Sequence, residues 1–499
     1  MDIKVVNAGG NKMSARPTLV PSELPSQLAR PSMKYKEVSR RSLEGALPIA
    51  TCLFLPLVQI KDLFYIYDIV TVYSIYKLGF PSVPYRGRSI GNSVRLLAIA
   101  VLLATLSSLV RTGFELRSIM YCAQYLLALI YFYCLFSNIA AGRLDGSLLA
   151  AWVIKGAVLA GAFGILHFVL LTVAPSAGNA LYRGYLSLAG FSDRFYQLRY
   201  VAGVENTGVI RALGTWDVST TFGGMMVLAS AWLLYAKHIT KSVRYSAFIL
   251  LSFAVLASGS RHAWVIGLIV LFALVEGSRR YKLFVASCFV GGLALWVFLS
   301  ATPDDLGGTS FSNQIYNRFE RTVSSGLEDS SIQLRYVDGT SNFLLYIMKD
   351  PSVLVFGFGL NTDKIWFQSM DIAAFASERI DNYNWGFVSN GWLLILRNMG
   401  ILGFVGLLGL FLSIRRLGRS AVDVPLLIAA LLILSDNYAI QVARCFFMIL
   451  AFLAVIAGDA LFRLQNRKRV YPESSTHSPR SMGNSSVTKQ EKRRLDRRS

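Results

Sequence analysis

Apolar runs long enough to cross a lipid bilayer recur along this chain, and they constrain its fold more than any other feature. A membrane-spanning helix needs about 20 predominantly apolar residues, and such runs recur between residues 43 and 462 of the 499-residue sequence. Only 16% of the residues are charged, whereas soluble domains carry about 25%. These observations exclude an ordinary soluble enzyme and a disulfide-stapled secreted domain. They predict an all-α polytopic membrane protein.

The apolar runs predict about 12 transmembrane helices. The expected spans are 43–60, 62–79, 95–111, 118–140, 147–174, 217–236, 244–259, 262–277, 283–301, 387–414, 422–438 and 444–462. A long polar segment at about 302–386 separates the ninth span from the tenth and predicts one large loop on one side of the membrane.

Positive charge is concentrated at the two ends of the chain. Residues 1–42 contain eight basic and three acidic residues, and residues 463–499 contain 11 and three. Both are polar and are predicted to be disordered basic arms around one transmembrane domain at 43–462. The positive-inside rule places both arms in the cytoplasm and the acidic 302–386 loop on the opposite side. The net charge of +21 is then a topology signal, so a lipid bilayer and not nucleic acid is the expected partner.

Three arginines stand out because they lie on the side where topology does not require positive charge. Arg211 precedes an apolar helix, Arg261 lies in Ser258-Gly-Ser-Arg-His-Ala-Trp between two barely separated spans, and Arg335 lies in the large loop. Ionisable groups near membrane depth are functional candidates, and arginine binds phosphate oxygens bidentately. Arginines converging on one cavity would suit a diphosphate. Snorkelling side chains and loop caps are the alternative interpretations.

The sequence offers no obvious site for a metal or a nucleotide cofactor. The four histidines, His167, His238, His262 and His477, have no metal-ligand spacing. The chain has no P-loop and no Rossmann glycine fingerprint. Gly357 and Gly359 suit a tight turn or a close backbone approach. We therefore expect no metal and no cofactor.

Taken in order, these motifs resemble the O-antigen polymerase/ligase superfamily, multi-pass enzymes that handle undecaprenyl-diphosphate-linked glycans. The segments that begin at Arg211 and Ser258 are similar to two of its arginine elements, and the region from Arg335 to Gly359 resembles the start of its large periplasmic loop. Val388-Ser-Asn-Gly-Trp-Leu and Asn398-Met-Gly-Ile-Leu-Gly resemble its last element. Ligases of the superfamily typically have histidine where this chain has Ser389. That difference favours the polymerase branch.

The resemblance implies a GT-C-like, metal-independent glycosyltransferase in the inner membrane of a bacterium. Donor and acceptor would both be undecaprenyl-diphosphate-linked glycans, joined at the periplasmic face, with a chain-length regulator and a flippase as candidate partners. Arg211, Arg261 and Arg335 would neutralise the two diphosphates, and Arg444, at the outer start of the last span, is a fourth candidate.

The resemblance leaves the general base and the branch of the superfamily open. His262 and Asp217 lie close to motif arginines and could take a proton. The further substrate-binding candidates are Asp217, Ser389, Asn390, Gly357 and Gly359. A ligase is one alternative function. A lipid-linked oligosaccharide transporter is another, although residues 43–260 and 261–462 show none of the internal repetition that transporters often have.

Overall fold

The structure is a bundle of α-helices. The computed structural model describes residues 35–60, 64–83, 87–112, 116–189, 211–216, 218–274, 344, 347–348, 350–360, 391–417, 419–435 and 443–470. The helices are α1 (Tyr35–Phe54), α2 (Ile66–Leu78), α3 (Arg88–Thr112), α4 (Leu116–Ala140), α5 (Gly146–Val173), α6 (Pro175–Leu188), α9 (Ser219–Trp232), α10 (Lys241–Ala257), α11 (Arg261–Leu274), α16 (Ser352–Phe356), α18 (Gly391–Leu417), α19 (Arg419–Ser435) and α21 (Ala443–Val470). Two short strands, β1 (Gln59–Ile60) and β2 (Phe64–Tyr65), pair antiparallel between α1 and α2.

The prediction of an all-α polytopic membrane protein is confirmed. Five helices in the described part of the chain are both long and apolar enough to cross a membrane: α3, α4, α5, α18 and α21. The predicted spans overlap described helices everywhere except at 283–301, which lies outside the described residues. The total of 12 spans therefore stays a prediction.

The first and last helices of the chain, α1 and α21, extend further than the sequence predicts. The first begins at Tyr35 and the last continues to Val470, so parts of both predicted disordered arms are helical. Ion pairs one helical turn apart contribute to this extension, because Arg41 pairs with Glu37 and Arg463 pairs with Asp459. Another difference is α6, an amphipathic helix between the predicted spans 147–174 and 217–236.

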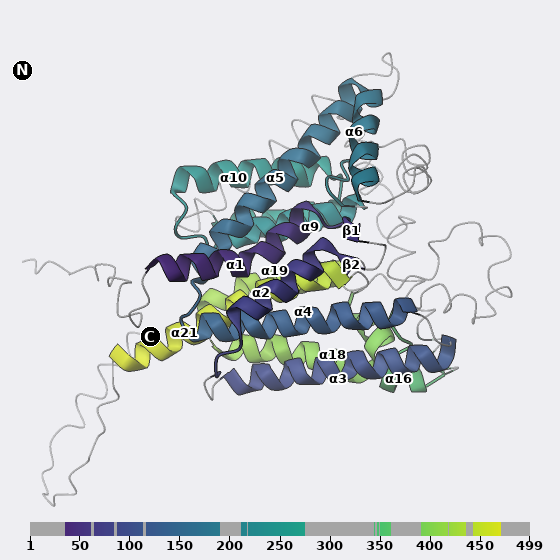
Figure 1. Ribbon diagram of the computed structural model, residues 1–499, viewed down its shortest axis with the longest axis vertical. Helices are drawn as coiled ribbons and strands as arrows, with labels where there is room; N and C mark the ends of the chain where they lie inside the picture. Colours follow the sequence, from purple (N-terminus) through teal and green to yellow (C-terminus); the bar gives the residue numbers. More distant parts are fainter. Residues whose placement is uncertain are drawn as a thin grey trace, which may run out of the picture.

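Of the five long apolar helices, α21 is the most buried, with 83% of its most apolar stretch inside the bundle. It packs against α4, while α3 packs against α18 and α1 against α5. Figure 1 shows these helices running side by side along the bundle, with α6 lying across one end. Lipid-facing helices such as α3 leave many large apolar side chains exposed, as expected where the surrounding solvent is hydrocarbon.

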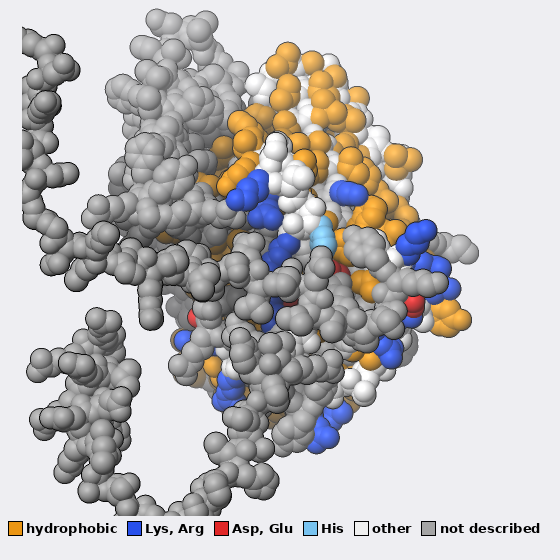
Figure 2. Space-filling model, turned by 90° about the vertical axis from the view of Figure 1, so that its left-hand side faces the viewer, with side chains coloured by type: hydrophobic (Ala, Val, Ile, Leu, Met, Phe, Trp, Pro, Cys, Tyr) orange, Lys and Arg blue, Asp and Glu red, His pale blue; other side chains and the backbone are white. Residues whose placement is uncertain are grey.

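The bundle has two ends of different character. The helix α1 begins and α21 ends at the same end, on the left of Figure 1, which we call the terminal end. The strands β1 and β2, together with α6 and α16, lie at the other end, which we call the hairpin end. Figure 2 faces the terminal end and shows many Lys and Arg side chains there.

Candidate functional site

The segment from Arg211 to Trp216 lies at the hairpin end and is held on several sides. The Ala212 amide donates to the Ala257 carbonyl at 2.9 Å, where α10 ends. The Thr215 hydroxyl donates to the Leu53 carbonyl of α1 at 2.9 Å. Gly214 has a φ of 58° beside the Phe222 ring, a backbone that favours glycine. The segment is therefore a fixed part of the bundle.

The turn between α10 and α11 carries the second arginine motif. The Ser258 hydroxyl donates to the Val255 carbonyl at 2.6 Å, and the Ala263 amide donates to the Ser260 hydroxyl at 3.3 Å. Ser260 thus caps the start of α11. The close approach of α9 at Gly223 fixes the turn from the other side, since a Cβ there would lie 2.4 Å from the Ser258 oxygen.

The hydrogen bond between Ala212 and Ala257 brings these two motifs together, as their predicted common role requires. Arg211 itself is half-buried, and its Nε is buried without a hydrogen-bond partner in the described part of the chain. Arg261 is the first residue of α11, but its side chain lies outside the described residues. His262, the next residue along, is half-buried.

Arg444 lies at the start of α21, beside the Arg211 segment. We call the Arg211–Trp216 segment, the turn before Arg261 and Arg444 the arginine cluster. The Arg444 side chain is only 4% exposed. The guanidinium lies 5.6 Å from the Tyr65 ring centroid and 5.5 Å from that of Trp216, the last residue of the Arg211 segment. Its Nη1 also donates to the Tyr65 hydroxyl at 3.3 Å. A desolvated guanidinium over aromatic rings gains about 2 kcal/mol in favourable cases, so this cation is held in place by two rings.

An acidic side chain, Asp68, lies beside the arginine cluster. Its Oδ2 accepts from the Tyr65 amide at 3.1 Å and from the Gln124 side chain at 3.3 Å. Tyr67, the neighbouring residue, lies within electrostatic reach of both Asp68 and Arg444. Asp68 is 4% exposed. Two hydrogen bonds to one oxygen orient the carboxylate and leave Oδ1 as its second acceptor atom.

Gly357 and Gly359 belong to a segment docked on a break in α18. The break is at Gly400, whose φ of 64° is not helical. The Phe358 amide donates to the Arg397 carbonyl at 2.6 Å, and the Gly359 amide donates to the Asn398 carbonyl at 3.2 Å. Backbone carbonyls freed by the break are thereby satisfied from a different part of the chain. Of the two roles that the sequence left open for these glycines, a tight turn or a close backbone approach, the structure shows a close backbone approach at both.

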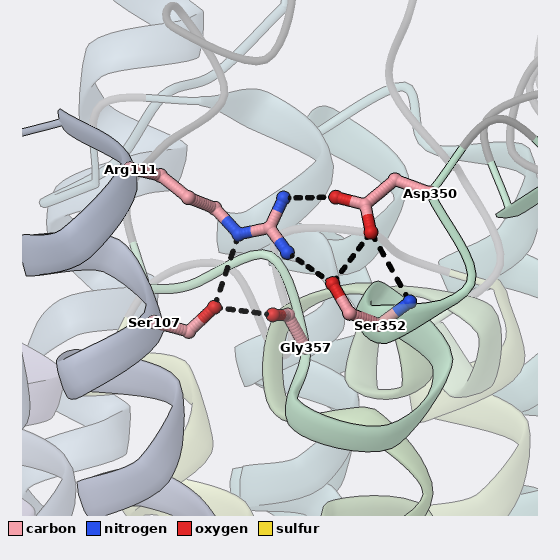
Figure 3. A network of polar contacts seen from close by, with 5 residues as sticks. All are labelled: Ser107, Arg111, Asp350, Ser352 and Gly357. Atoms are coloured by element: carbon pink, nitrogen blue, oxygen red, sulfur yellow. Dashed lines mark hydrogen bonds and ion pairs between the residues drawn. The ribbon is translucent and has the colours of Figure 1, made fainter.

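A polar network anchors this segment to α3 (Figure 3). The Arg111 guanidinium donates to the Asp350 carboxylate at 2.5 Å and to the Ser352 hydroxyl at 2.7 Å. The same guanidinium donates to Ser107, whose hydroxyl donates to the Gly357 carbonyl at 2.8 Å. Partial burial opposes ionisation of Asp350, but hydrogen bonds from Ser352 and Arg111 and the charge of Arg111 together hold its pKa below the usual value.

Sequence reasoning missed three charged residues that the structure places at or near the hairpin end: Asp68, Arg111 and Arg397. Arg397 is 1% exposed inside α18 and donates to the Asn398 side chain at 2.9 Å. The rule that ionisable groups within apolar spans are functional candidates would have found Arg397 and Asp68, since both lie inside predicted spans.

The remaining predicted site residues lie outside the described part of the chain. They are Arg335, Asp217, Ser389 and Asn390. The structure thus brings together the Arg211 segment, the turn before Arg261 and Arg444. It places Gly357 and Gly359 in a separate cluster on α18. In the described part of the chain, no group of three or more His, Cys, Asp or Glu side chains could hold a metal ion.

Comparison with known families identifies part of the chain. Residues 246–408 match the family model described as O-antigen ligase. The match confirms the resemblance to the O-antigen polymerase/ligase superfamily that the motifs indicate. It covers about a third of the chain, from α10 to the second half of α18, and so includes Arg261 and the two glycines but neither Arg211 nor Arg444. No curated protein matches the chain significantly. The chain therefore combines an O-antigen ligase-like region with a multi-pass membrane fold.

Proposed function

We propose that this protein is a polysaccharide polymerase that joins undecaprenyl-diphosphate-linked repeat units at the hairpin end of the bundle. The observation that carries the proposal is that the Arg211 segment links the other two motifs. Ala212 is hydrogen-bonded to Ala257 just before the Arg261 turn, and the buried Trp216 ring lies beside the Arg444 guanidinium. The Arg211 segment and Arg444 come from outside the matched region, yet the segment contacts both Arg444 and the residue before the matched turn.

Arginines at this position suit a diphosphate leaving group. When the bond between the anomeric carbon and the donor phosphate oxygen breaks, negative charge develops on the lipid diphosphate. Fixed guanidinium groups stabilise that charge most where water is excluded, and Arg444 is almost completely buried. In the proposed site Arg211, Arg261 and Arg444 bind the diphosphates, together with Arg335 from the large loop.

Asp68 is the proton acceptor in this proposal. The acceptor hydroxyl gives its proton to Asp68, and its oxygen lone pair forms the new bond to the anomeric carbon. The electron pair of the broken bond stays on the departing lipid diphosphate. Asp68 later releases the proton to water. His262 and Asp217, the candidates from the sequence, are alternatives for this step.

The choice of polymerase over ligase rests on Ser389, which stands where ligases of the superfamily typically have histidine. Incubating the purified protein with one lipid-linked repeat unit alone separates the two. A polymerase gives longer lipid-linked chains. Product that forms only after addition of a second acceptor, such as lipid A core, would instead identify a ligase. Movement of the repeat unit across a vesicle membrane without chemical change would identify a transporter.

The arginine assignment has its own test. We expect Arg444→Ala and Arg211→Ala to lower kcat by about 100-fold or more, the usual loss when a transition-state charge donor is removed. Arg183→Ala is the matched control, because Arg183 is an exposed arginine on α6 at the same end. Arg444→Lys should also lose most activity if bidentate contact is needed. Full activity in Arg444→Ala would remove Arg444 from the site.

The proposed reaction faces the periplasm, with both termini in the cytoplasm of a bacterial inner membrane. The positive-inside rule supports this orientation, since many Lys and Arg side chains lie at the terminal end (Figure 2) and both chain termini carry a net positive charge. A flippase that delivers the repeat unit to that face and a chain-length regulator are the partners such a reaction calls for.

A further inference from the structure

A cavity at the terminal end has no role in the proposed reaction. It has a volume of about 310 Å³ and is lined by Lys36, Ser39, Arg40 and Leu43 of α1 and by Trp152 of α5. The volume is at the lower end of the range for ligand sites. The two helices touch further along, where a Cβ on Gly156 would lie 2.8 Å from the Ala50 side chain. The cavity thus lies at the terminal end of the bundle, where α1 and α5 begin.

Lys155 adds a second observation beside this cavity. It is exposed on α5, about 14 Å along the helix axis from Gly146. An exposed lysine at that depth on a spanning helix faces lipid, where an unpaired charge is costly. Its ammonium lies 3.7 Å from the centroid of the Trp152 ring, on the wall of the cavity. The side chain therefore reaches back toward the terminal end, as snorkelling lysines do.

Charge and apolar surface are arranged here as a lipid requires. Lys36, Arg40 and Lys155 supply positive charge at the cavity, partly offset by Glu44, which accepts from Arg40 at 3.1 Å. Below them the same faces of α1 and α5 are apolar and exposed, with Leu47 40% exposed and Leu159 58% exposed. Cations above an apolar strip match a phosphate headgroup above an acyl chain.

We propose that this cavity binds the phosphate headgroup of an anionic lipid in the leaflet at the terminal end. The Lys155 ammonium and the Lys36 and Arg40 side chains bind the phosphate, Ser39 offers a hydroxyl, and the acyl chain lies along Leu47 and Leu159. Basic pockets between membrane helices bind anionic headgroups for this reason. The site is independent of the proposed glycosyl transfer.

The test uses the full-length protein in neutral detergent. Phosphatidylglycerol should raise its thermal midpoint, whereas phosphatidylcholine at the same concentration should not. Each neutralised side chain should weaken apparent phosphatidylglycerol binding roughly fivefold, so the triple variant Lys36→Gln, Arg40→Gln, Lys155→Gln should lose the response. Lys155→Gln alone, which changes one exposed residue, gives the same comparison if the triple variant does not fold.

Lys77→Gln is the matched control. Lys77 also lies over aromatic rings, 5.6 Å from Tyr73 and 5.5 Å from Tyr76, but outside the cavity. It should keep the wild-type response. An undiminished response in Lys155→Gln, or an equal loss in Lys77→Gln, would overturn the site in favour of diffuse surface attraction. An equal response to inorganic phosphate would overturn the lipid as its ligand.

Discussion

Asp68 and Asp145 are both buried aspartates near the start of a helix, but they lie at opposite ends of the bundle. Asp68 accepts from the Tyr65 amide at the start of α2, and Asp145 accepts from the Ser147 amide at the start of α5. They are 4% and 7% exposed. The difference is their surroundings, because Asp68 has Arg444 nearby while Asp145 has His238, at 3.3 Å.

This pair gives a test of the proton acceptor. Asp68→Asn keeps an oxygen that can accept from Tyr65 and Gln124 but removes the base. We expect kcat for chain elongation to fall by about 100-fold or more, with binding of the lipid-linked donor and the thermal midpoint almost unchanged. Asp145→Asn should retain activity. Equal activity in wild type and Asp68→Asn would exclude Asp68 while leaving the proposed reaction intact.

The break in helix α18 at Gly400 can be compared with Gly79, the glycine that follows α2. Gly79 and Gly400 have nearly the same backbone, with φ values of 63° and 64°. A Cβ on Gly400 would lie 2.3 Å from the Val355 carbonyl oxygen, whereas a Cβ on Gly79 would have no neighbour within 4 Å. Comparing the two separates backbone strain from the docking of the Val355 segment.

We expect both alanine substitutions to cost about 1–3 kcal/mol, since a positive φ with ψ near 180° is a backbone that essentially only glycine adopts. Gly400→Ala should cost more, because its clash with backbone also displaces the segment that satisfies the Arg397 and Asn398 carbonyls. Thermal midpoints of the two variants in detergent measure the difference. Equal shifts would show that the segment is not held at the break.

The ion pair between Arg111 and Asp350, which anchors the Val355 segment to α3, should weaken at low pH. The pKa of Asp350 is held below its usual value, so its contribution to stability is present above the ordinary aspartate pKa of about 3.9 and is lost as pH falls through the lower, folded value. Wild type should therefore have a higher free energy of unfolding than Asp350→Asn at pH 7. This gap in stability should narrow at about pH 3 and below. Both side chains of the Arg111–Asp350 pair are partly exposed, so the gap should also shrink in high salt. A gap that is constant across this pH range would contradict the ion pair.

Sequence patterns predicted the elements whose signal is local. Long apolar helices such as α5 stand out by hydropathy, and the turn between α10 and α11 was expected at Ser258–Arg261. The 14-residue helix α6 was missed because it is amphipathic and too short to span. The break at Gly400 was missed because a glycine in an apolar run does not reveal whether its backbone is helical.

At the scale of the whole molecule, the arginine cluster could not be assembled from sequence alone. The Arg211–Trp216 segment and Arg444 are far apart in the chain, and only the packing of α21 beside the end of α1 brings them together. Order and resemblance predicted a common role for the motifs. They did not predict the aromatic rings that hold Arg444 or the carboxylate of Asp68 beside it.

The two ends of the bundle make the orientation testable. Thr240 is exposed in the loop before α10, at the terminal end, and Gly184 is exposed on α6, at the hairpin end. Four of the five cysteines, Cys52, Cys122, Cys134 and Cys445, are buried. With the fifth, Cys288, replaced by serine, a new exposed cysteine should react with a membrane-impermeant maleimide well above the background of these four. If the hairpin end faces the periplasm, Gly184→Cys reacts once the outer membrane is permeabilised, whereas Thr240→Cys reacts only after the inner membrane is opened. The reverse pattern would place the arginine cluster in the cytoplasm, where periplasmic repeat units could not reach it.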